Sequence, residues 1–580
     1  GRRFVSALPK PAPAAPPSET EFDYVIVGGG SAGCVMANRL SADGRSRVLL
    51  IEAGPDTTPE EVPDEILDSY PLAVFHGDRY VWPNLKARSV AGLGVPRLYE
   101  QGRVMGGGSS VNVQAANRGM PRDYDAWRDM GAAGWGWEDV LPYFRRLERD
   151  VDFDGPLHGD SGPLPIRRVD PSAWNGFARA LADAFAADGH SRLADQNGEF
   201  GDGYFPPAIS NLYDRRVTTA MAYLDRKVRR RPNLVVLSGH QVERILFDSG
   251  SAYAVVATAP GRPSVTFGCR RLVLTAGALN TPALLLRSGI GPGGQLQTLG
   301  IACRADIPAV GRNLQDHPCL TFGHYLPSGY RVSPYPRRVS LVGLRYSSAV
   351  PGAPQSDMYL ATSGRASWHA LGARLGVYFL WCNQPFSHGE LTLASPDPRE
   401  SPRIELNLLS DPRDAARMAD GVRRLAAISR HLPFHERDDD LLAIALSPRI
   451  KALAQVNRRN AVLARFAGAA MDAAGVLRGP LLRRLISQGA RTGRLVADDE
   501  ALAAFIRRHV FGVWHASGTC RMGAHGAADA VVDPAGKVAR LGNVWIADAS
   551  VMPRLPSANT NIPTIMIAEK ISDGLVRAAG

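Results

Sequence analysis

The chain has 580 residues, about four times the size of a common domain, so we expect about two to four compact units. Hydrophobic residues make up 45% of the sequence and charged residues 21%, close to the globular average, and no apolar run is long enough to predict a transmembrane helix. The net charge of +11 would suit nucleic acid or an anionic membrane, but most of it lies in a single segment, so we predict no nucleic-acid partner.

Residues 1–21 carry the paired arginines of an export signal, but the proline-rich stretch behind them has no apolar core, so we expect a disordered arm. The six cysteines lie far apart with no CxxC pair. This spacing argues against a disulfide framework and against a zinc or iron–sulfur site, and we predict no metal. A reducing, cytoplasmic location fits this pattern best.

The segment from Phe22 to Gly54 is typical of a strand, a glycine-rich turn, a helix and a second strand. Gly28, Gly30 and Gly33 form a GxGxxG motif directly after the first apolar run, and Glu52 ends the next one. In a dinucleotide site such glycines permit a tight turn, close approach of a pyrophosphate to backbone N–H groups, and close helix packing, while the acid accepts from a ribose hydroxyl. The motif therefore predicts dinucleotide binding.

The same turn has a second interpretation, because Gly29, Ser31 and Gly33 spell GxSxG, the nucleophile elbow of α/β-hydrolases. An elbow normally lies well inside the chain, after strands that supply its oxyanion hole, whereas this motif follows the first strand. Glu52 also has no evident place in a hydrolase. A hydrolase is therefore the weaker alternative.

Strand-like apolar runs return far along the chain, at Leu234–Leu237, Arg271–Thr275 and Val544–Ala547. Their separation predicts a discontinuous nucleotide-binding domain with a second domain inserted between its pieces. The expected nucleotide domain comprises residues 22–155, 230–318 and 510–580, and the expected substrate domain comprises residues 156–229 and 319–509.

The middle of the chain, from about Phe322 to Leu408, alternates polar and apolar residues as strands do, and helical patterns follow from Asp411 to Leu432. The expected fold class is therefore α/β together with α+β. It combines a discontinuous Rossmann-like domain with a substrate domain built on an antiparallel sheet and flanked by helices.

Two further glycine-rich segments are interpreted as backbone that approaches a ligand. Gly102–Asn112 contains no strand-like run, and its small residues suit a loop that lies close to a ligand. An ordinary linker would not explain Arg103 and Asn112 at its edges. Gly277–Pro292 follows the strand-like run RLVLTA and is typical of a turn into a helix.

Near the C-terminus, His515 stands between bulky residues and a Gly/Ser/Thr turn, and Asn561 precedes Pro563 and a helical pattern. A lone histidine is more often a satisfied core residue than a catalyst, and an asparagine in this position is often a helix cap. The residues alone leave both alternatives open.

In this order and spacing, these segments resemble the glucose–methanol–choline (GMC) family of FAD oxidoreductases from about Phe22 to about Val576. Gly102–Asn112 is similar to the family's first signature and Gly277–Gly291 to its second. The resemblance implies a domain that holds FAD and a second domain whose antiparallel sheet roofs the flavin. Some members link FAD through a histidine at the position of Val111, so we expect FAD to be bound non-covalently here.

The resemblance also implies roles for single residues. His515 falls at the family's active-site histidine and Asn561 at a second position that holds Asn or His. In this scheme His515 takes the hydroxyl proton of an alcohol while the carbon delivers hydride to flavin N5, and Asn561 donates to the developing alkoxide. The residues expected to contact FAD are Gly28, Gly30, Ser31, Ala32, Gly33, Glu52, Ala53, Arg103, Gly106, Gly107, Ser109, Asn112, Val113, Val242, Ala276, Asp548, Ala549, Asn559, Thr560, Asn561 and Ile562.

The expected substrate is a flat primary alcohol of the aryl or furanic type, oxidised to the aldehyde and, through the aldehyde hydrate, on to the acid. O2 is the expected acceptor, giving H2O2. The alternatives are a membrane-associated alcohol dehydrogenase that uses a quinone and a non-redox hydroxynitrile lyase. An apolar pocket is expected from Phe379, Trp381, Val513 and Trp514, which are otherwise core of the sheet.

The segment Ser447–Leu495 holds ten basic residues and one acid, Asp472, a charge of +9 that leaves +2 for the rest of the chain. Its apolar residues recur at helical spacing with arginines beside them: Val462, Leu463, Phe466, Ala467, Ala470, Met471 and Ala474. One interpretation is a solvated helical lid or an oligomer contact. The other is a basic amphipathic element that rests on an anionic membrane.

Overall fold

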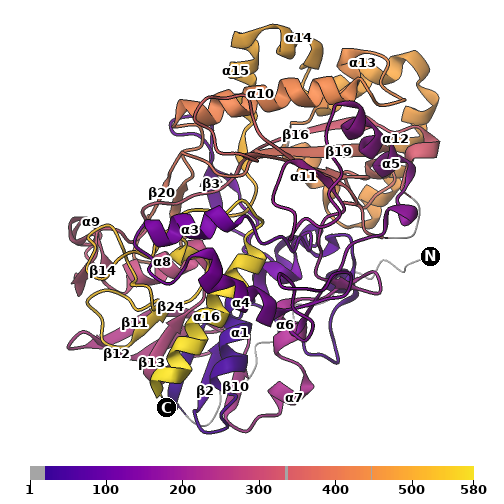
Figure 1. Ribbon diagram of the computed structural model, residues 1–580. Coiled ribbons are helices and arrows are strands. Elements are labelled where there is room, and N and C mark those ends of the chain that lie inside the picture. The colour runs from indigo at the N-terminus through magenta and orange to yellow at the C-terminus, as the bar shows by residue number, and fades with distance from the viewer. Residues whose placement is uncertain (1–19, 333–336, 446, 580) are drawn as a thin grey trace.

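The computed structural model describes residues 20–332, 337–445 and 447–579, which form two seven-stranded sheets, four smaller sheets and surrounding helices (Figure 1). The predicted disordered arm falls outside the described residues at positions 1–19. Its last residue, Glu21, already belongs to the first strand, β1. The mixed architecture of parallel and antiparallel sheets with flanking helices confirms the expected fold class.

The first sheet contains the predicted apolar runs as neighbouring strands, with the parallel order β10-β2-β1-β13 and β24 on the far side of β13. All residues of β2 are buried, as expected for strands covered on both faces. Two antiparallel strands extend the sheet from the first half of β13. Its strands are β1 (Glu21–Val27), β2 (Val48–Ile51), β10 (Leu234–Leu237), β11 (Gln241–Asp248), β12 (Ser251–Thr258), β13 (Val265–Leu274) and β24 (Val544–Ile546).

Two of the parallel strands lead directly into helices, β1 into α1 (Ser31–Leu40) and β13 into α8 (Gly277–Arg287), and β24 leads through a short 3-10 turn towards α16 (Asn561–Ala579). Because the carboxyl ends of parallel strands lie at one edge of a sheet, the N-termini of these helices gather there. Helix α1 packs against α16, and Arg39 of α1 forms a two-pronged ion pair with Glu569 of α16. This edge of the sheet is a favourable site for an anionic ligand.

The second sheet is antiparallel, with the order β22-β16-β19-β18-β17-β7 and β23 also paired to β16. Its register aligns Ala361 with Phe379 and Tyr359 with Trp381, so these side chains share one face. Its strands are β7 (Gly203–Phe205), β16 (Pro318–Tyr325), β17 (Gly343–Tyr346), β18 (Met358–Ser363), β19 (Leu375–Cys382), β22 (Leu442–Ala443) and β23 (Phe511–Gly512).

Shorter strands and further helices complete the described chain. The strands are β3 (Lys86–Arg88), β4 (Arg97–Leu98), β5 (Glu148–Asp150), β6 (Leu164–Ile166), β8 (Asn211–Leu212), β9 (Arg215–Arg216), β14 (Ile290–Gly291), β15 (Ala305–Asp306), β20 (Glu390–Thr392) and β21 (Arg403–Glu405). The helices are α2 (Asp64–Leu67), α3 (Pro121–Asp129), α4 (Trp137–Leu147), α5 (Gly176–Ala187), α6 (Thr219–Tyr223), α7 (Arg226–Arg229), α9 (Gly293–Thr298), α10 (Pro412–Ser429), α11 (Pro448–Ala454), α12 (Arg458–Ala473), α13 (Arg478–Ile486), α14 (Thr492–Ala497) and α15 (Asp499–His509).

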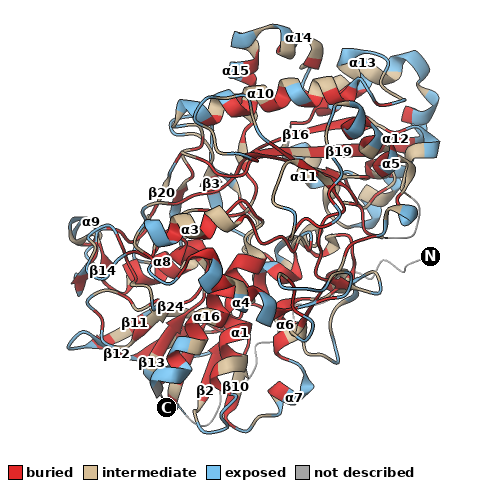
Figure 2. Cartoon of the chain, viewed as in Figure 1, coloured by how far each residue is buried: buried red, intermediate tan, exposed pale blue. Residues whose placement is uncertain are grey.

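The basic segment folds into helices α11–α14, and α12 confirms the helical spacing of its apolar residues. The inner side of α12 buries Ala464 and Met471, and Met471 packs with β19 and β22. Helices α12, α13 and α14, which carry exposed residues, lie at the outer edge of the molecule (Figure 2). No helix in the described part of the chain is long and apolar enough to cross a bilayer.

Candidate active site

A cavity of about 730 Å³ is lined by residues of both sheets and begins at the edge where α1, α8 and α16 start. The predicted residues that line it are Gly28, Gly30, Ser31, Ala32, Glu52, Ala53, Gly107, Asn112, Val113, Val242, Ala276, Phe379, Trp381, Val513, Trp514, His515, Asp548, Ala549, Asn559, Thr560 and Asn561. The predicted residues that do not line it are Gly33, Arg103, Gly106, Ser109 and Ile562. Of these five, Arg103 is partly buried and the other four are buried.

The glycine-rich turn has the form that a dinucleotide requires. Gly28 has a φ of +105°, and a side chain at Gly33 would place its Cβ 1.9 Å from the Gly28 carbonyl oxygen. Gly107 of the second glycine-rich segment lies against Gly30, where a Cβ would come within 2.7 Å of the Gly30 Cα. Helix α1 has no side-chain cap, so its first N–H groups are available to a pyrophosphate.

Two buried carboxylates brace this end of the cavity. Glu52 accepts from the backbone N–H of Gly29 at 2.8 Å and of Gly54 at 2.7 Å. Asp548 accepts from the backbone N–H of Gly277 at 2.8 Å. Burial raises the pKa of both carboxyl groups. Each oxygen of Glu52 keeps a second lone pair, so Glu52 can also accept from the hydroxyls of a bound dinucleotide. Asp548 also accepts from the hydroxyl of Thr281 and from the N–H and hydroxyl of Ser550, so its carboxylate is fully bonded and fixes the backbone at this end of the cavity.

Ser31 decides between the two interpretations of the glycine-rich turn. Its hydroxyl donates to the amide oxygen of Asn561 at 2.6 Å, which joins the start of α1 to the start of α16. A hydrolase elbow would instead present this serine to a histidine base. Among the described residues no histidine contacts Ser31, so the hydrolase alternative is not supported.

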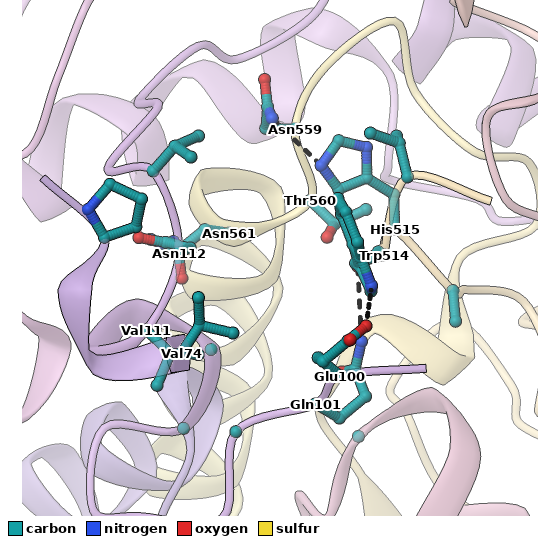
Figure 3. Close-up of a pocket in the computed structure, with 18 of the residues that line it drawn as sticks. Val74, Glu100, Gln101, Val111, Asn112, Trp514, His515, Asn559, Thr560 and Asn561 are labelled. Carbon is teal, nitrogen blue, oxygen red and sulfur yellow. Dashed lines mark hydrogen bonds between the residues drawn. The ribbon is translucent and has the colours of Figure 1, made fainter. Parts of the chain in front are cut away.

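His515 lies in the cavity wall in a network of side chains from three distant segments (Figure 3). Its Nε2 atom lies 3.0 Å from the amide nitrogen of Asn559, and its Nδ1 atom lies 2.8 Å from Nδ1 of His317. The Nε2 atom of His317 in turn lies 3.2 Å from the carbonyl oxygen of Pro556. Burial lowers the pKa of His317 to about 4 and lowers that of His515, with a further contribution from His317.

These contacts define where the protons of both rings lie. A carbonyl oxygen only accepts, so Nε2 of His317 carries its proton and Nδ1 holds a lone pair. Nδ1 of His515 must therefore be the donor between the rings. Since His515 is neutral, its Nε2 atom holds a lone pair, and this lone pair accepts from Asn559 in the cavity wall. His515 is thus held in the tautomer that a general base requires.

The structure brings Asn559, rather than the expected Asn561, to His515. Asn561 is the first residue of α16, and its side chain contacts Ser31. Asn559 precedes the helix, and its side chain lies on the side of His515. The side chains of Asn559 and Asn561 have different partners because α16 begins at Asn561, so Asn559 still belongs to the preceding loop. The sequence SANTNIP does not show at which residue the helix begins.

The backbone of His515 is fixed by buried groups that the sequence did not reveal. Asp316 accepts from the N–H of His515 at 2.9 Å and from the hydroxyl of Tyr99 at 2.6 Å. Tyr99 in turn accepts from the N–H of Ala516 at 3.1 Å. Trp514 has a φ of +65°, which is strained for an aromatic residue, and such strain is typical of functional sites.

The expected pocket residues form an aromatic wall and are also partly core. Trp381 is buried and stacks on Tyr359 with ring centroids 4.6 Å apart, and its ring lies 6.2 Å from that of His515. The indole of Trp514 donates to Glu100 at 2.8 Å, and Lys451 of α11 pairs with the same carboxylate at 2.8 Å. Helix α11 of the basic segment therefore borders the cavity.

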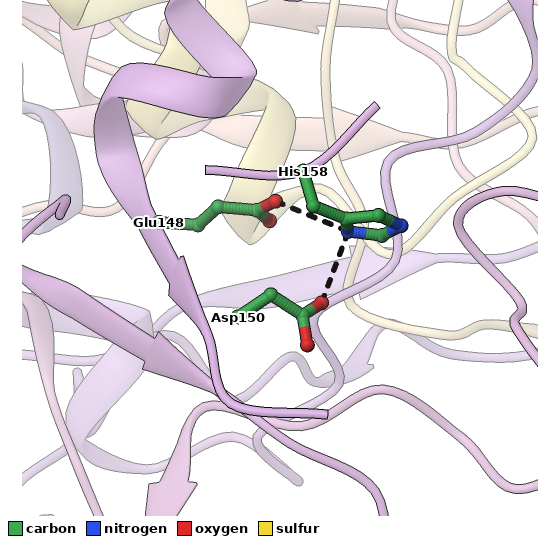
Figure 4. Close-up of side chains that lie close together, drawn as sticks. All are labelled: Glu148, Asp150 and His158. Carbon is green, nitrogen blue, oxygen red and sulfur yellow. Dashed lines mark ion pairs between the residues drawn. The ribbon is translucent and has the colours of Figure 1, made fainter. Parts of the chain in front are cut away.

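A second cluster of titratable side chains lies outside the cavity, where Glu148, Asp150 and His158 meet (Figure 4). Arg168 bonds to Asp150 and Asp195, and Arg118 pairs with Glu148. Burial opposes a charge on His158, but its contacts with the three carboxylates raise its pKa to about 10. Three cations thus balance three anions, and a protonated histidine is not a metal ligand.

A dinucleotide turn, a cavity roofed by an antiparallel sheet and a neutral histidine base in its wall define an oxidoreductase that uses a bound dinucleotide. Family models described as GMC oxidoreductase match residues 22–319 and 385–568. The chain belongs to the GMC oxidoreductase family and is an FAD-dependent alcohol oxidoreductase.

Individual relatives cover almost the whole chain. It is 43% identical over 577 residues to a 5-(hydroxymethyl)furfural oxidase of Methylovorus sp. (strain MP688), covering 97% of this chain and 100% of the relative. It is 31% identical to an alcohol dehydrogenase [acceptor] of Pseudomonas putida, covering 96% of each. The solved structure of pyridoxine 4-oxidase from Mesorbium loti matches with a TM-score of 0.78 and 28% identity, covering 96% of this chain and 99% of that one.

Proposed function

We propose that the chain oxidises flat primary alcohols of the aryl and furanic type to aldehydes, with O2 as acceptor and H2O2 as product. The observation that supports this proposal is the neutral His515, whose Nε2 lone pair lies in the wall of a cavity bounded by aromatic side chains, where Asn559 donates to it. The similarity to a 5-(hydroxymethyl)furfural oxidase supports the same substrate class. Hydrated aldehydes present the same carbinol group, so oxidation continues to the acid.

The residues of the chain would act on the substrate hydroxyl as follows. FAD, when bound, supplies the hydride acceptor. Nε2 of His515 takes the hydroxyl proton, a contribution of about 10²–10⁴ to the rate. Asn559 has a second amide hydrogen that can donate to the substrate oxygen as negative charge develops. The aromatic rings of Trp381 and Trp514 exclude water and hold a flat substrate.

We also propose that FAD is held without a covalent bond, because Val111 lines the cavity with an aliphatic side chain. We propose residues 22–155, 230–318 and 510–580 as the FAD domain, supported by the parallel strands of the first sheet, and residues 156–229 and 319–509 as the substrate domain, supported by the second sheet. Strand β23, at the start of the last FAD segment, pairs with β16 of the second sheet. Six free cysteines suit the reducing cytoplasm that we propose as the location.

The test is a comparison of acceptors with the FAD-loaded protein. Benzyl alcohol and 5-(hydroxymethyl)furfural are added, and aldehyde, H2O2 and the reduction of a quinone analogue are measured. We expect one H2O2 for each two-electron step, so one for each alcohol converted to the aldehyde and two for each alcohol converted to the acid. Quinone reduction without H2O2 would favour the dehydrogenase alternative, and cleavage of a cyanohydrin without flavin bleaching would favour a lyase.

We further propose that helices α12 and α13 rest on an anionic bilayer. Seven of the fifteen large hydrophobic residues that are exposed in the described part of the chain lie between Val462 and Leu485, and they are Val462, Leu463, Phe466, Val476, Leu477, Leu481 and Leu485. Arg459, Arg465 and Arg484 lie beside them and form no ion pair within the described chain. A second copy would bring like charges together, whereas anionic lipid would neutralise them.

Sedimentation with vesicles tests this surface. We expect binding to phosphatidylglycerol vesicles that weakens with added salt, and little binding to phosphatidylcholine. Replacing Phe466 and Leu485 by serine should abolish binding, while the control Tyr253→Ser, at an exposed residue of β12, should not. Concentration-dependent dimerisation without vesicle binding would instead favour the oligomer contact.

A further inference from the structure

The cavity contains a buried arginine that is not needed for the proposed chemistry. Arg338 is 2% exposed and lines the cavity. Its guanidinium donates to the carbonyl oxygens of Ser340, at 3.2 Å, and Val113. No carboxylate within the described chain bonds to it. Burial lowers its pKa to about 10, which still leaves it charged at neutral pH.

The surroundings of Arg338 carry more positive than negative charge. Arg216, Arg337 and Arg365 lie in the same region, which has the carboxylates Asp68 and Asp214. Asp68 pairs with Arg337, and Asp214 accepts from the backbone N–H of Arg337. Repulsion from Arg338 adds to burial in lowering the pKa of Arg216 to about 9. Asp214 is near enough to favour the charge on Arg338 but forms no bond with it. A buried cation without a bonded carboxylate is costly, so this end of the cavity favours an anion.

The position of Arg338 relative to His515 defines which part of a ligand would meet it. Arg338 lies close enough to Tyr359 to affect its pKa, and Tyr359 stacks on Trp381. Trp381 continues to His515, with ring centroids 6.2 Å apart. The aromatic wall therefore has the base at one end and the arginine near the other. A flat substrate along this wall, with its hydroxyl at His515, would point its opposite end towards Arg338.

We propose that Arg338 forms a subsite for a carboxylate, and that the enzyme prefers alcohols and aldehydes whose ring carries a carboxylate opposite the reacting group. The inference rests on the proposed function and deepens it. Oxidation of one arm of a ring with two hydroxymethyl groups yields a monoacid, and that monoacid is itself such a substrate. The cation would pair with the first acid group while His515 acts on the second arm.

A matched pair of substrates tests the subsite in the FAD-loaded enzyme. 4-(Hydroxymethyl)benzoate and 4-(hydroxymethyl)benzamide have the same shape and differ in charge. A charge-assisted bond predicts that kcat/KM is about 10- to 100-fold higher for the benzoate. R338M should lose this factor for the benzoate and keep kcat/KM for the benzamide within about 3-fold. R338K keeps the charge and should recover part of the preference.

Binding without turnover separates this proposal from the proposed function. Benzoate, which lacks the alcohol, should perturb the absorbance of bound FAD in wild type and bind at least about 10-fold more weakly to R338M. If neither alcohol is oxidised but benzoate binds in this way, the subsite stands and the proposed oxidation fails. Equal losses for both alcohols in R338M, or no preference for the benzoate in wild type, would overturn the subsite.

Discussion

Replacing His317 by leucine removes the acceptor that faces Nδ1–H of His515. The two Nδ1 atoms are 2.8 Å apart, and leucine would leave a buried N–H without a partner, at a cost of about 1–3 kcal/mol. His515 avoids this cost by moving its proton to Nε2, but it then lacks the lone pair that accepts the substrate proton. The population of the tautomer with a lone pair on Nε2 falls by the factor that this free energy sets, so we expect hydride transfer to be about 5- to 150-fold slower.

The assay is anaerobic stopped-flow bleaching of FAD by benzyl alcohol, with His317→Asn as the matched control. The amide oxygen of asparagine takes the place of Nδ1 and preserves the acceptor. We expect His317→Leu to lose about 5- to 150-fold and His317→Asn to stay within about 5-fold. Because burial lowers the pKa of both histidines, neither ring should take up a proton as the pH falls below about 6.5, the ordinary histidine value. A change in the wild-type rate near pH 7 would instead come from Asp316, whose pKa burial raises to about 7. A leucine variant as fast as wild type would refute the tautomer argument.

Four further substitutions test other contacts of the structure. Asn559→Ala should slow the anaerobic step by about 100-fold, whereas Asn561→Ala should leave it within about 3-fold and weaken FAD retention, measured by dialysis. Gly33→Ala places a Cβ 1.9 Å from the Gly28 oxygen and should yield protein without a flavin spectrum. His158→Leu breaks a buried ion-pair network and should cost about 3–5 kcal/mol in urea unfolding. Because the pKa of His158 is raised to about 10, its contribution is complete below about pH 6.5 and declines as the pH rises towards 10.

The parts of the fold that could be predicted from the sequence are those that neighbouring residues in the chain determine. The runs in β1, β2, β10 and β24 are apolar because both faces of these strands are covered, and the turn at Gly28 is visible because no other residue tolerates that approach. Such signals identified the sheet and the dinucleotide turn without knowledge of any distant contact.

The partners of His515 could not be predicted in the same way. Its partners His317, Asp316 and Tyr99 lie about 200 or more residues away from it in the sequence. Nothing in the sequence around each of them distinguishes it from an ordinary polar residue. For Asn559 the sequence offers two asparagines, and only the start of α16 decides which one faces the base. Arg338 was missed for a similar reason, since its lack of a counterion is a property of the fold.

The choice of a histidine as the partner of His515 has a chemical consequence. A carboxylate at Nδ1 would stabilise the imidazolium and raise the pKa of the base, but the nearby carboxyl of Asp316 bonds to the backbone N–H instead. The ring faces the neutral His317, which adds to burial in lowering its pKa. The pKa of His515 is therefore low before a substrate binds. Proton uptake becomes favourable when negative charge lies against Nε2, which happens as the substrate hydroxyl is deprotonated, so the base is strongest at the moment of reaction.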